Sequence, residues 1–549
     1  MRTVNMLAAV LLGATAATPT TPATPAADNM VDLIIIGAGW SGMGAADHIV
    51  RAKAGVTFTV LEARNDTGGR TRAMPFGDDS PAGPGKFIVE RGSNWICGVG
   101  GGGAGHDVHP AAPSGPTTNP VHDLAVRMGM KRTLIPGSTQ NMSNYAKVFG
   151  VNGTDADPTG ALRDAANAAL DCVNATARPL TDDDDAGYGN KVTTREAMSA
   201  CGWNPKTEAE WAVDWVATED DPGFPASEQA AADFAPDESY MWWGKDDYFV
   251  VDQNPRGYAA LLDLMVADTL PDGDPRVVFN ARVAHIAYDC GGVNVTLSDG
   301  SVHRAREVIS TLPLGVLQRH HADMFTPPIP AKHAKVLTEK GVVMANLTHV
   351  VLQFPKSFAF PAKWKDLPRW VSANAAGPDE RSWMSGMFSE WQNLNHATMI
   401  PGSNMLLSFL GDPQSSYYEG QPDAVGQAAA MLALRAQNPE LSIPDPVAFF
   451  ISRHGYDELS YGAYAGYLPG WKDIFIETLL TPLSAQGCTP GSPTGEKRVR
   501  FSGEATCDDL DGFTHGGLQS GIETAAMYLY DTGKGPNPAH SVKTSLCYF

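Results

Sequence analysis

A glycine-rich turn near the N-terminus has the residue types and the spacing that bind a dinucleotide. The β-branched run Val31–Ile36 leads into Gly37, Gly39 and Gly42, which fit the pattern G-x-G-x-x-G. The first glycine allows a tight turn, the second lets the backbone approach a pyrophosphate, and the third lets a helix pack closely against the strand. The phosphates would then meet free N–H groups at a helix N-terminus. Glu62 follows at about the 20-residue spacing at which an acid binds ribose hydroxyls. The alternative is a glycine-rich structural turn.

Three further segments carry a resemblance to a known family. Residues 61–70 read Leu-Glu-Ala-Arg, three residues, then Gly-Gly-Arg; residues 500–521 contain Gly-Glu-Ala-Thr followed by Gly-Phe-Thr-His-Gly-Gly; and residues 308–317 add a match between them. This combination resembles the flavin amine oxidase family, in particular secreted polyamine oxidases. The Gly-Gly-Arg tail favours FAD over NAD. The segment 500–521 is similar to the part that closes over the flavin in monoamine and polyamine oxidases.

The resemblance implies an α/β fold in which a discontinuous Rossmann-type FAD-binding domain receives an inserted α+β substrate-binding domain. The FAD-binding domain would comprise residues 30–120, 257–330 and 456–549, and the substrate domain residues 121–256 and 331–455. The local patterns predict helices that begin near Asn119 and Gly257. They also predict strands near Val277, Val283 and Val293, and another from Thr348 to Phe354.

FAD is the cofactor that the resemblance implies, and it is expected to bind non-covalently. Ala463 stands where monoamine oxidases carry the cysteine that bonds the flavin, and a methyl group cannot form that bond. The residues expected to hold FAD are Gly37, Gly39, Trp40, Ser41, Gly42, Glu62, Ala63, Arg64, Gly69, Arg70, Gly92, Ser93, Asn94, Trp95, Val283, Gly503, Glu504, Gly512, Phe513 and Thr514.

Two aromatic residues are expected to align the substrate on the exposed face of the flavin. Tyr464 lies in a segment similar to the one that carries one aromatic wall in the family, and Phe513 takes the position of the other. The second wall is usually tyrosine, so Phe513 keeps the stacking face and loses the hydroxyl. The alternative is that both rings are ordinary core residues.

Two acids are candidates to hold a distal ammonium group of the substrate. The segment Val89–Trp95, which contains Glu90, resembles the polyamine oxidase segment whose glutamate lies in the catalytic tunnel. A carboxylate there can bind an ammonium by charge-assisted hydrogen bonds. Asp221 is the second candidate. The alternative for Glu90 is a strand-end acid that pairs with Arg91 or with a flavin hydroxyl.

The strand Thr348–Phe354 departs from the family at one position. Most of the family carries a lysine that holds a water against flavin N5, in a strand of the form Thr-Lys-x-x-Leu-x-Phe, whereas this chain has His349 there. A histidine can also hold water, and it changes charge near neutral pH when unperturbed. The alternative is a shifted strand in which His349 is a surface histidine. Because His349 replaces the family lysine, the resemblance leaves open how reduced flavin reacts with oxygen, which substrate class is oxidised, or both.

The resemblance therefore implies FAD-dependent oxidation of a small-molecule amine, most simply a polyamine, by hydride transfer to the flavin. Dioxygen would reoxidise the flavin and give hydrogen peroxide. The alternatives are an L-amino-acid oxidase or another amine oxidase of the same fold, and a flavin-binding protein that has lost the amine oxidase site. An L-amino-acid oxidase would need an arginine for the substrate carboxylate, and no arginine stands out in that role.

Composition and the N-terminus favour an exported globular enzyme. The net charge of -21 and the pI of about 5.0 argue against nucleic acid and against an anionic membrane surface as partners. Residues 1–17 resemble a secretory signal peptide, and residues 18–29 form a low-complexity leader of Thr, Pro and Ala. Seven cysteines are compatible with one to three disulfides and leave at least one thiol unpaired, and Cys172 with Cys201 is a candidate pair. Sequons for N-glycosylation occur at Asn141, Asn152, Asn174, Asn294 and Asn346.

Overall fold

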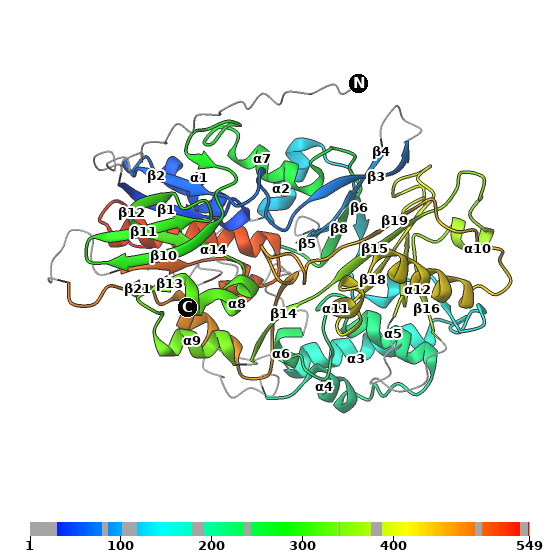
Figure 1. Cartoon of the computed structure of the whole chain (residues 1–549). Coiled ribbons are helices and arrows are strands. Elements are labelled where there is room, and N and C mark those ends of the chain that lie inside the picture. The colour runs from blue at the N-terminus through cyan, green and yellow to red at the C-terminus, as the bar shows by residue number, and fades with distance from the viewer. Residues whose placement is uncertain are drawn as a thin grey trace, which may run out of the picture.

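The computed structural model describes residues 30–79, 86–100, 118–177, 191–234, 243–339, 341–374, 387–488, 497–538 and 547. The predicted signal peptide and leader lie outside these residues. Figure 1 shows two halves, one built around β1, β12 and α14 and the other around β15, β18 and α12. Each half contains its own large sheet.

The first sheet has nine strands among the described residues, in the order β13-β10-β11-β12-β1-β2-β9, with β22 beside β12 and β21 beside β22. The strand β1 is parallel to both of its neighbours, β12 and β2. The bounds are β1 Val31–Ile36, β2 Phe58–Leu61, β9 Val277–Val278, β10 Val283–Asp289, β11 Gly292–Leu297, β12 Val302–Ser310, β13 Phe325–Thr326, β21 Leu483–Ser484 and β22 Lys497–Phe501.

Both faces of this sheet are covered, which explains why β1 is apolar almost throughout. Leu33 and Ile35 pack in a cluster with residues of α1, α2, α7 and α14, whereas Ile34 and Ile36 pack in another cluster with residues of α8, α9 and α13. Successive side chains of a strand point to opposite faces, so the single run Leu33–Ile36 belongs to two cores. The covering helices are α1 Trp40–Ala52, α2 Pro120–Met128, α7 Ala260–Val266, α8 Leu314–Met324, α9 Ala331–Thr338, α13 Lys472–Leu480 and α14 Thr514–Asp531.

The second sheet has six strands within the described ranges, in the order β19-β15-β18-β17-β16-β7. Every side chain of β15 is buried, so this strand is central both in order and in packing. The strands are β7 Val148–Phe149, β15 Thr348–Gln353, β16 Arg369–Ser372, β17 Glu390–Asn393, β18 Met405–Leu410 and β19 Ala448–Ile451. The helices of this half are α3 Ala161–Ala177, α4 Thr194–Ala200, α5 Glu208–Thr218, α6 Ala231–Phe234, α10 Ala362–Lys365, α11 Gln414–Glu419 and α12 Asp423–Ala436.

Smaller sheets connect segments that the sequence assigned to different domains. The strand β14 pairs with β20, and β5 pairs with β8, which also pairs with β6. A separate hairpin joins β3 and β4. These strands are β3 Ala73–Asp79, β4 Lys86–Glu90, β5 Trp95–Val99, β6 Arg132–Ile135, β8 Asp246–Val250, β14 Val342–Ala345 and β20 Tyr464–Tyr467. Four short 3₁₀ helices complete the described elements: η1 Met142–Asn144, η2 Gly257–Ala259, η3 Glu504–Thr506 and η4 Asp508–Leu510.

The strands of each large sheet come from the separate segments that the sequence predicts. The first sheet takes its strands from residues 31–61, 277–326 and 483–501, and the second from residues 148–149 and 348–451. The helix predicted near Asn119 is α2, with the Asn119 side chain accepting hydrogen bonds from two backbone N–H groups of its first turn. The domain bounds themselves stay predictions.

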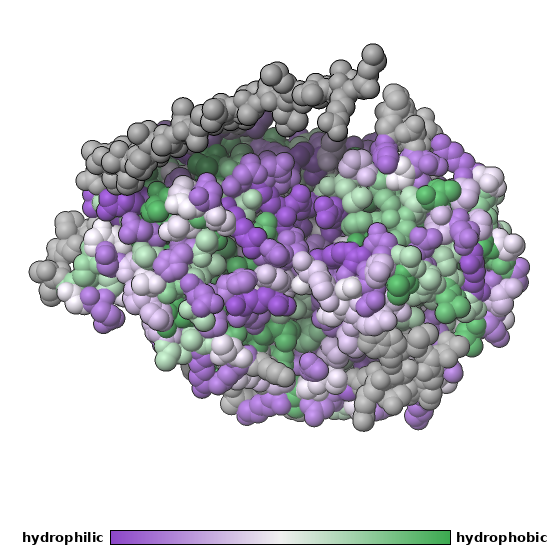
Figure 2. All heavy atoms as spheres, viewed as in Figure 1, coloured by the Kyte–Doolittle hydropathy of each residue, from purple (hydrophilic) through white to green (hydrophobic). Residues whose placement is uncertain are grey.

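Three disulfides are present: Cys172–Cys201, Cys290–Cys488 and Cys507–Cys547. The predicted pairing of Cys172 with Cys201 is confirmed, and Cys97 is the buried free thiol. None of the helices in the described ranges combines the length and the apolar composition needed to cross a lipid bilayer. On the face drawn in Figure 2, apolar residues form separate patches among hydrophilic ones.

Candidate functional site

One cavity of about 560 Å³ brings together residues of both halves of the molecule. Its wall contains every site residue predicted from the sequence except Gly42 and Glu90. The residues come from the ends of β1 and β2, from the segment after β4, from β15 and β20, and from the start of α14. The predicted cofactor and substrate residues, far apart in the chain, therefore face one space.

The glycine turn has the geometry of a phosphate cradle. Gly37 has a φ of +101°, and a Cβ on Gly42 would lie 1.9 Å from the carbonyl oxygen of Gly37, so only glycine fits at both places. Gly42 thus acts by packing beneath the turn and does not line the cavity. Gly39 is the N-cap of α1 and provides no side-chain cap. The first N–H groups of α1 can therefore bind an anion.

Glu62 lies at the end of β2, beside this cradle. Its carboxylate accepts hydrogen bonds from the backbone N–H groups of Ala38, at 2.7 Å, and Arg64, at 2.8 Å. Burial raises its pKa, although both hydrogen bonds stabilise the charged form. Val283, at the start of β10, lines the same cavity. These positions suit the ribose and the adenine of a dinucleotide.

A partly buried ion pair joins the second glycine motif to the C-terminal segment. Arg70 donates through Nη1 to Glu504 at 2.8 Å and to the carbonyl oxygen of Ala463 at 2.9 Å. The other oxygen of Glu504 accepts from the backbone N–H groups of Ala465, at 3.2 Å, and Gly512, at 3.0 Å. The pair fixes three loops that line the cavity, and no sulfur is present at position 463.

The two predicted aromatic walls both line the cavity, and each contacts another residue of the same lining. Tyr464 donates its hydroxyl hydrogen to the carbonyl oxygen of Asp221. The ring of Phe513 stacks on His515, with centroids 5.2 Å apart and an interplanar angle of 13°. Burial lowers the pKa of His515 to about 3, so the supporting ring is neutral. The wall roles of Tyr464 and Phe513 stay predictions.

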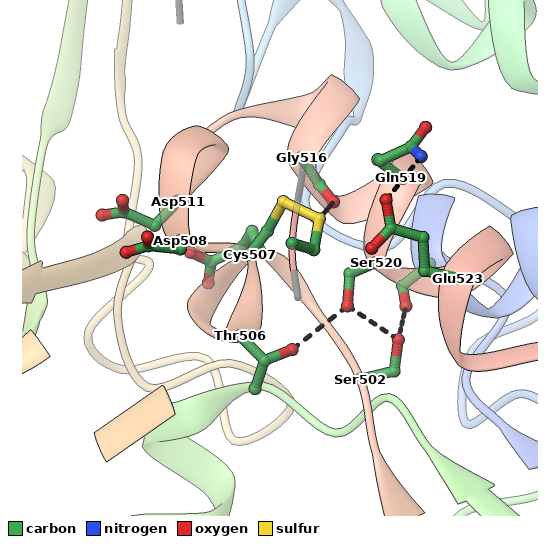
Figure 3. The surroundings of a disulfide bond; sticks show 12 residues. Ser502, Thr506, Cys507, Asp508, Asp511, Gly516, Gln519, Ser520 and Glu523 are labelled. Atoms are coloured by element: carbon green, nitrogen blue, oxygen red, sulfur yellow. Dashed lines mark hydrogen bonds between the residues drawn. A yellow bond between two sulfur atoms is a disulfide. The ribbon is translucent and has the colours of Figure 1, made fainter. Parts of the chain in front are cut away.

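Figure 3 draws the surroundings of the disulfide Cys507–Cys547. Both sulfurs are fully buried in a cluster against which Phe513 packs. Beside it, Ser520 is hydrogen-bonded to Ser502 at 3.0 Å and to Thr506 at 3.1 Å, as drawn in Figure 3. The covalent link thus anchors the chain near its C-terminus against the loop that carries one cavity wall.

His349 is buried, so the alternative of a surface histidine is wrong. It is 5% exposed, lines the cavity and packs edge-to-face on Phe409, with ring centroids 5.1 Å apart. Burial, together with the neighbouring His454, lowers its pKa to about 3. Because desolvation disfavours the imidazolium, we expect His349 to be neutral near pH 7, unlike an unperturbed histidine. Its role with a water molecule stays a prediction.

Glu90 differs from its prediction as a substrate anchor, because its side chain does not line the cavity. Its Oε1 accepts the backbone N–H of Tyr258 at 2.7 Å, and its Oε2 has no partner among the described atoms. Burial raises its pKa to about 8. The carboxyl group thus points to the backbone that begins η2, whereas its carbonyl oxygen lies 3.4 Å from Nδ1 of His349. This placement favours a structural role.

The substrate-domain wall of the cavity contains polar residues beyond those that the sequence predicts. Asp221 was predicted, and Asp220, Gln229 and Gln140 join it. Burial raises the pKa of Asp221 to about 6 and that of Asp220 well above its usual range. The adjacent pair of aspartates was a visible signal in the sequence. The two glutamines gave none, because nothing local distinguishes a cavity glutamine from a surface one.

The residues present fit FAD. The glycine cradle excludes side chains where a pyrophosphate would approach, Glu62 and Val283 lie on the same wall, and the cavity continues to Tyr464 and Phe513. A further acceptor without a partner, Oδ1 of Asn94, belongs to the segment after β4 that was predicted to contact the cofactor.

Comparisons with known proteins agree with this geometry. The family model described as flavin containing amine oxidoreductase matches residues 40–527. Polyamine oxidase 1 of Zea mays is 26% identical over 506 residues, which cover 90% of each chain. Polyamine oxidase 7 of Oryza sativa subsp. japonica is 25% identical over 498 residues, covering 89% of this chain and 93% of the relative.

A structure of putrescine oxidase bound to putrescine has a TM-score of 0.61 at 18% identity, and the match covers 91% of this chain and 99% of that one. At this identity the likeness shows a shared fold. The family model, in contrast, begins at the first residue of α1 and spans the second glycine motif, the substrate wall and most of α14. The chain therefore belongs to the family of flavin-containing amine oxidoreductases and is an FAD-dependent amine oxidase.

Proposed function

We propose that the enzyme oxidises a polyamine or diamine and that dioxygen takes up the electrons as hydrogen peroxide. The observation that carries this proposal is the charge of the cavity wall. Asp220 and Asp221 face the cavity, and the histidines His349, His454 and His515 that line it have pKa values lowered by burial. A wall that offers carboxyl groups and neutral imidazoles favours a substrate with more than one cationic group.

The arginines of the cavity argue against an L-amino-acid oxidase. Three arginines line the described cavity, and each already pairs with a carboxylate: Arg64 with Asp457 at 2.5 Å, Arg70 with Glu504 at 2.8 Å and Arg282 with Glu458 at 2.8 Å. A substrate carboxylate would need a guanidinium of its own, and it would also meet Asp220 and Asp221. The cavity therefore disfavours an α-amino acid.

The chain's own residues supply position and electrostatics for the reaction. Bound FAD supplies the acceptor for a hydride from the carbon next to the substrate nitrogen. Tyr464 and Phe513, which both line the cavity, would confine that carbon between two rings. The neutral His349 can hold a water molecule through a ring nitrogen without adding charge.

Two further parts of the proposal concern the cofactor bond and the destination of the protein. We propose non-covalent FAD, supported by alanine at position 463, and acid precipitation of the yellow protein should leave the flavin in the supernatant. We also propose secretion, supported by three disulfides and by the apolar leader at residues 1–17. N-glycosylation would then be expected at sequons other than that of Asn346, because Asn346 is only 2% exposed.

Anaerobic bleaching of the oxidised flavin tests the substrate class. Spermidine, putrescine, n-butylamine and an L-amino acid are mixed in turn with the holoenzyme. We expect the diamine and polyamine to bleach the flavin fastest, and peroxide to form when air is admitted. Bleaching by the amino acid alone would overturn the proposal, and no bleaching by any amine would indicate a flavin-binding protein without amine turnover.

A further inference from the structure

One part of the cavity wall is a segment that belongs to neither large sheet. Residues 454–461 lie between β19 and β20, and His454, Glu458, Leu459 and Ser460 of this segment line the cavity. We call residues 454–461 the strap. Because the residues of this cavity fit FAD, the strap forms one wall of the cofactor site.

The strap is folded on itself by local hydrogen bonds. The backbone N–H groups of Ser460 and Tyr461 both donate to the carbonyl oxygen of Asp457, at 2.9 and 2.8 Å. The N–H of Gly462 donates to the carbonyl oxygen of His454 at 2.9 Å. These bonds join residues that are close in the chain, so they can persist when the strap moves as a unit. The position of the strap therefore depends on its contacts with other parts of the chain.

Both ends of the strap contact neighbouring segments. At its start, Nε2 of His454 lies 2.7 Å from the carbonyl oxygen of Arg91, which follows β4. At its end, the hydroxyl of Tyr461 lies 3.3 Å from Nε2 of His320, a residue of α8. The guanidinium of Arg319, also on α8, lies 4.4 Å from the centroid of the Tyr461 ring. The middle of the strap spans between these two attachments.

The helix α8 approaches the strap closely at Gly315. A Cβ at this position would lie 2.4 Å from the carbonyl oxygen of Ser460 and 2.8 Å from that of Tyr461. Glycine is the residue that allows such a close approach of two backbones. A larger residue at this position would therefore push the strap away from α8.

Two ion pairs connect the middle of the strap to the half of the molecule that contains β1. Asp457 accepts a hydrogen bond from Nη2 of Arg64 at 2.5 Å, and Glu458 accepts one from Nη1 of Arg282 at 2.8 Å. The side chains of Arg282 and Glu458 are 46% and 64% exposed. An exposed ion pair contributes little to stability, so the strap can open without unfolding the rest of the chain.

The arginine partners of the strap adjoin the residues that suit the ribose and adenine of FAD. Arg64 follows Glu62 by two residues, and Arg282 directly precedes Val283. All four residues line the cavity. The ion pairs therefore link the strap to the two loops that bound this end of the cavity.

We propose that the strap retains FAD, and that the ion pairs Arg64–Asp457 and Arg282–Glu458 open before the cofactor leaves. Release of FAD then has two steps, which are opening of the strap and departure of the cofactor. Loss of either partner of a pair favours the open strap and speeds release. The strap acts on the cofactor, so it works in the same way whichever amine is oxidised.

A direct attraction between Arg282 and FAD would have a different signature. The phosphates of FAD are negatively charged, so Glu458 would then repel the cofactor while Arg282 attracted it. Neutralising Glu458 would slow release in that case, whereas it speeds release if the ion pair keeps the strap closed. The sign of the Glu458→Gln effect therefore separates the two explanations.

Exchange with labelled cofactor measures the release rate. The holoenzyme is incubated at low ionic strength with an excess of isotope-labelled FAD, and the labelled fraction of protein-bound FAD is followed by mass spectrometry. We expect Arg282→Gln and Glu458→Gln each to speed release about two- to fivefold, as for the loss of one exposed ion pair. The charge-swapped double variant, Arg282→Glu with Glu458→Arg, should return to within about twofold of the unmodified rate.

Arg435→Gln is the matched control. Arg435 pairs with Asp445 at 2.8 Å, with side-chain exposures of 44% and 79%, and neither residue is among those that line the cavity. Loss of this ion pair should leave the release rate unchanged. The flavin absorbance spectrum, recorded before exchange starts, verifies that each variant has bound its cofactor.

Gly315→Ala tests the strap without changing a charge. The new Cβ would meet the carbonyl oxygen of Ser460 at 2.4 Å, so the strap must move. We expect release to become at least about fivefold faster, which is the lower end of the effect of overpacking.

Two results would overturn the strap. One is a release rate that Glu458→Gln leaves unchanged or makes slower. The other is a charge-swapped variant that releases FAD as fast as Arg282→Gln does. Both are read from bound cofactor alone, so they do not depend on which amine the enzyme oxidises.

Discussion

The cofactor end and the substrate end of the cavity differ in how their polar groups are satisfied. At the cofactor end the charged groups are paired, because Arg70 binds Glu504 and Glu62 accepts two backbone hydrogen bonds, and the amide oxygen of Asn94 is left without a partner among the described atoms. At the substrate end, Asp220 is hydrogen-bonded to another acid, Glu390, and Oε1 of Gln229 has no partner among the described atoms. A satisfied network holds a fixed shape, whereas an unsatisfied one gains free energy when a ligand completes it.

The difference shows where binding energy can be used. A cradle that is complete before the cofactor arrives binds it without rearrangement. An incomplete wall discriminates, because a ligand that lacks the matching donors leaves the buried acceptors unpaired. We therefore expect the cofactor end to bind FAD tightly and to tolerate few substitutions. We expect the substrate end to select among amines.

The largest effect should come from Gly42→Ala at the cofactor end. The new Cβ would lie 1.9 Å from the carbonyl oxygen of Gly37, so the turn must open. We expect loss of bound flavin and a fall in the free energy of unfolding of about 1–3 kcal/mol or more. Flavin absorbance per protein and thermal unfolding measure both.

Gly55→Ala is the control for this change. Gly55 also has a positive φ, +66°, but a Cβ there meets no atom within 4 Å. Gly55→Ala should lower the free energy of unfolding by about 1–2 kcal/mol through backbone strain and leave the flavin content unchanged. Equal flavin loss in both variants would contradict the cradle geometry.

Glu90→Gln should change the pH dependence of stability more than substrate choice. The pKa of Glu90 is raised to about 8, so its contribution to stability is complete below about pH 4.5 and is lost as the pH rises through 8. Glutamine imitates the protonated form. The free energy of unfolding of the variant, relative to that of the unmodified protein, should therefore increase by up to about 1.4 kcal/mol per pH unit as the pH rises toward 8.

Denaturant unfolding at several pH values measures this gain, and flavin bleaching measures substrate choice. Putrescine and butylamine should be affected equally, because the carboxyl group lies outside the cavity wall. A selective loss of putrescine turnover would restore Glu90 as a substrate anchor.

His349→Leu should have an intermediate effect, on the reaction of reduced flavin with oxygen. We expect reoxidation about tenfold slower, which is about 1.4 kcal/mol of barrier, with normal flavin content. Its pKa of about 3 means that the imidazole is neutral from pH 6 upward, so the pH profile should keep its shape in the variant. Stopped-flow mixing with oxygen measures both, and His303→Leu, on β12, serves as control. A flattened profile would show that His349 is charged in the holoenzyme.

The two ends of the cavity were unequally predictable from the sequence. Gly37, Gly39 and Glu62 act within one strand-turn-helix unit, so their spacing is enough to locate them. Gln140, Asp220 and Gln229 meet only after the second sheet has formed, and their roles depend on partners such as Glu390 that are distant in sequence. Hydrophobic alternation and motif spacing carry information about residues that are close in the sequence. The burial of a side chain and the charges around it depend on the whole fold. The same reason explains why the sequence does not reveal that the Glu90 carboxyl group accepts the backbone N–H of Tyr258 and does not line the cavity.

Phe513→Tyr should have the smallest effect and tests whether the wall works through its ring face. Tyrosine keeps the stacking surface against His515 and adds a hydroxyl. We expect Phe513→Tyr to change the rate of flavin bleaching by putrescine by less than about threefold. Phe513→Ala should slow this rate by more, since a stacked aromatic pair contributes about 0.5–1.5 kcal/mol beyond the area it buries. If Phe513→Tyr changes the rate as much as Phe513→Ala does, the hydroxyl reorganises the wall. The substrate end would then be sensitive to polar groups at Phe513 as well as at Asp220. This would increase the contrast with the cofactor end.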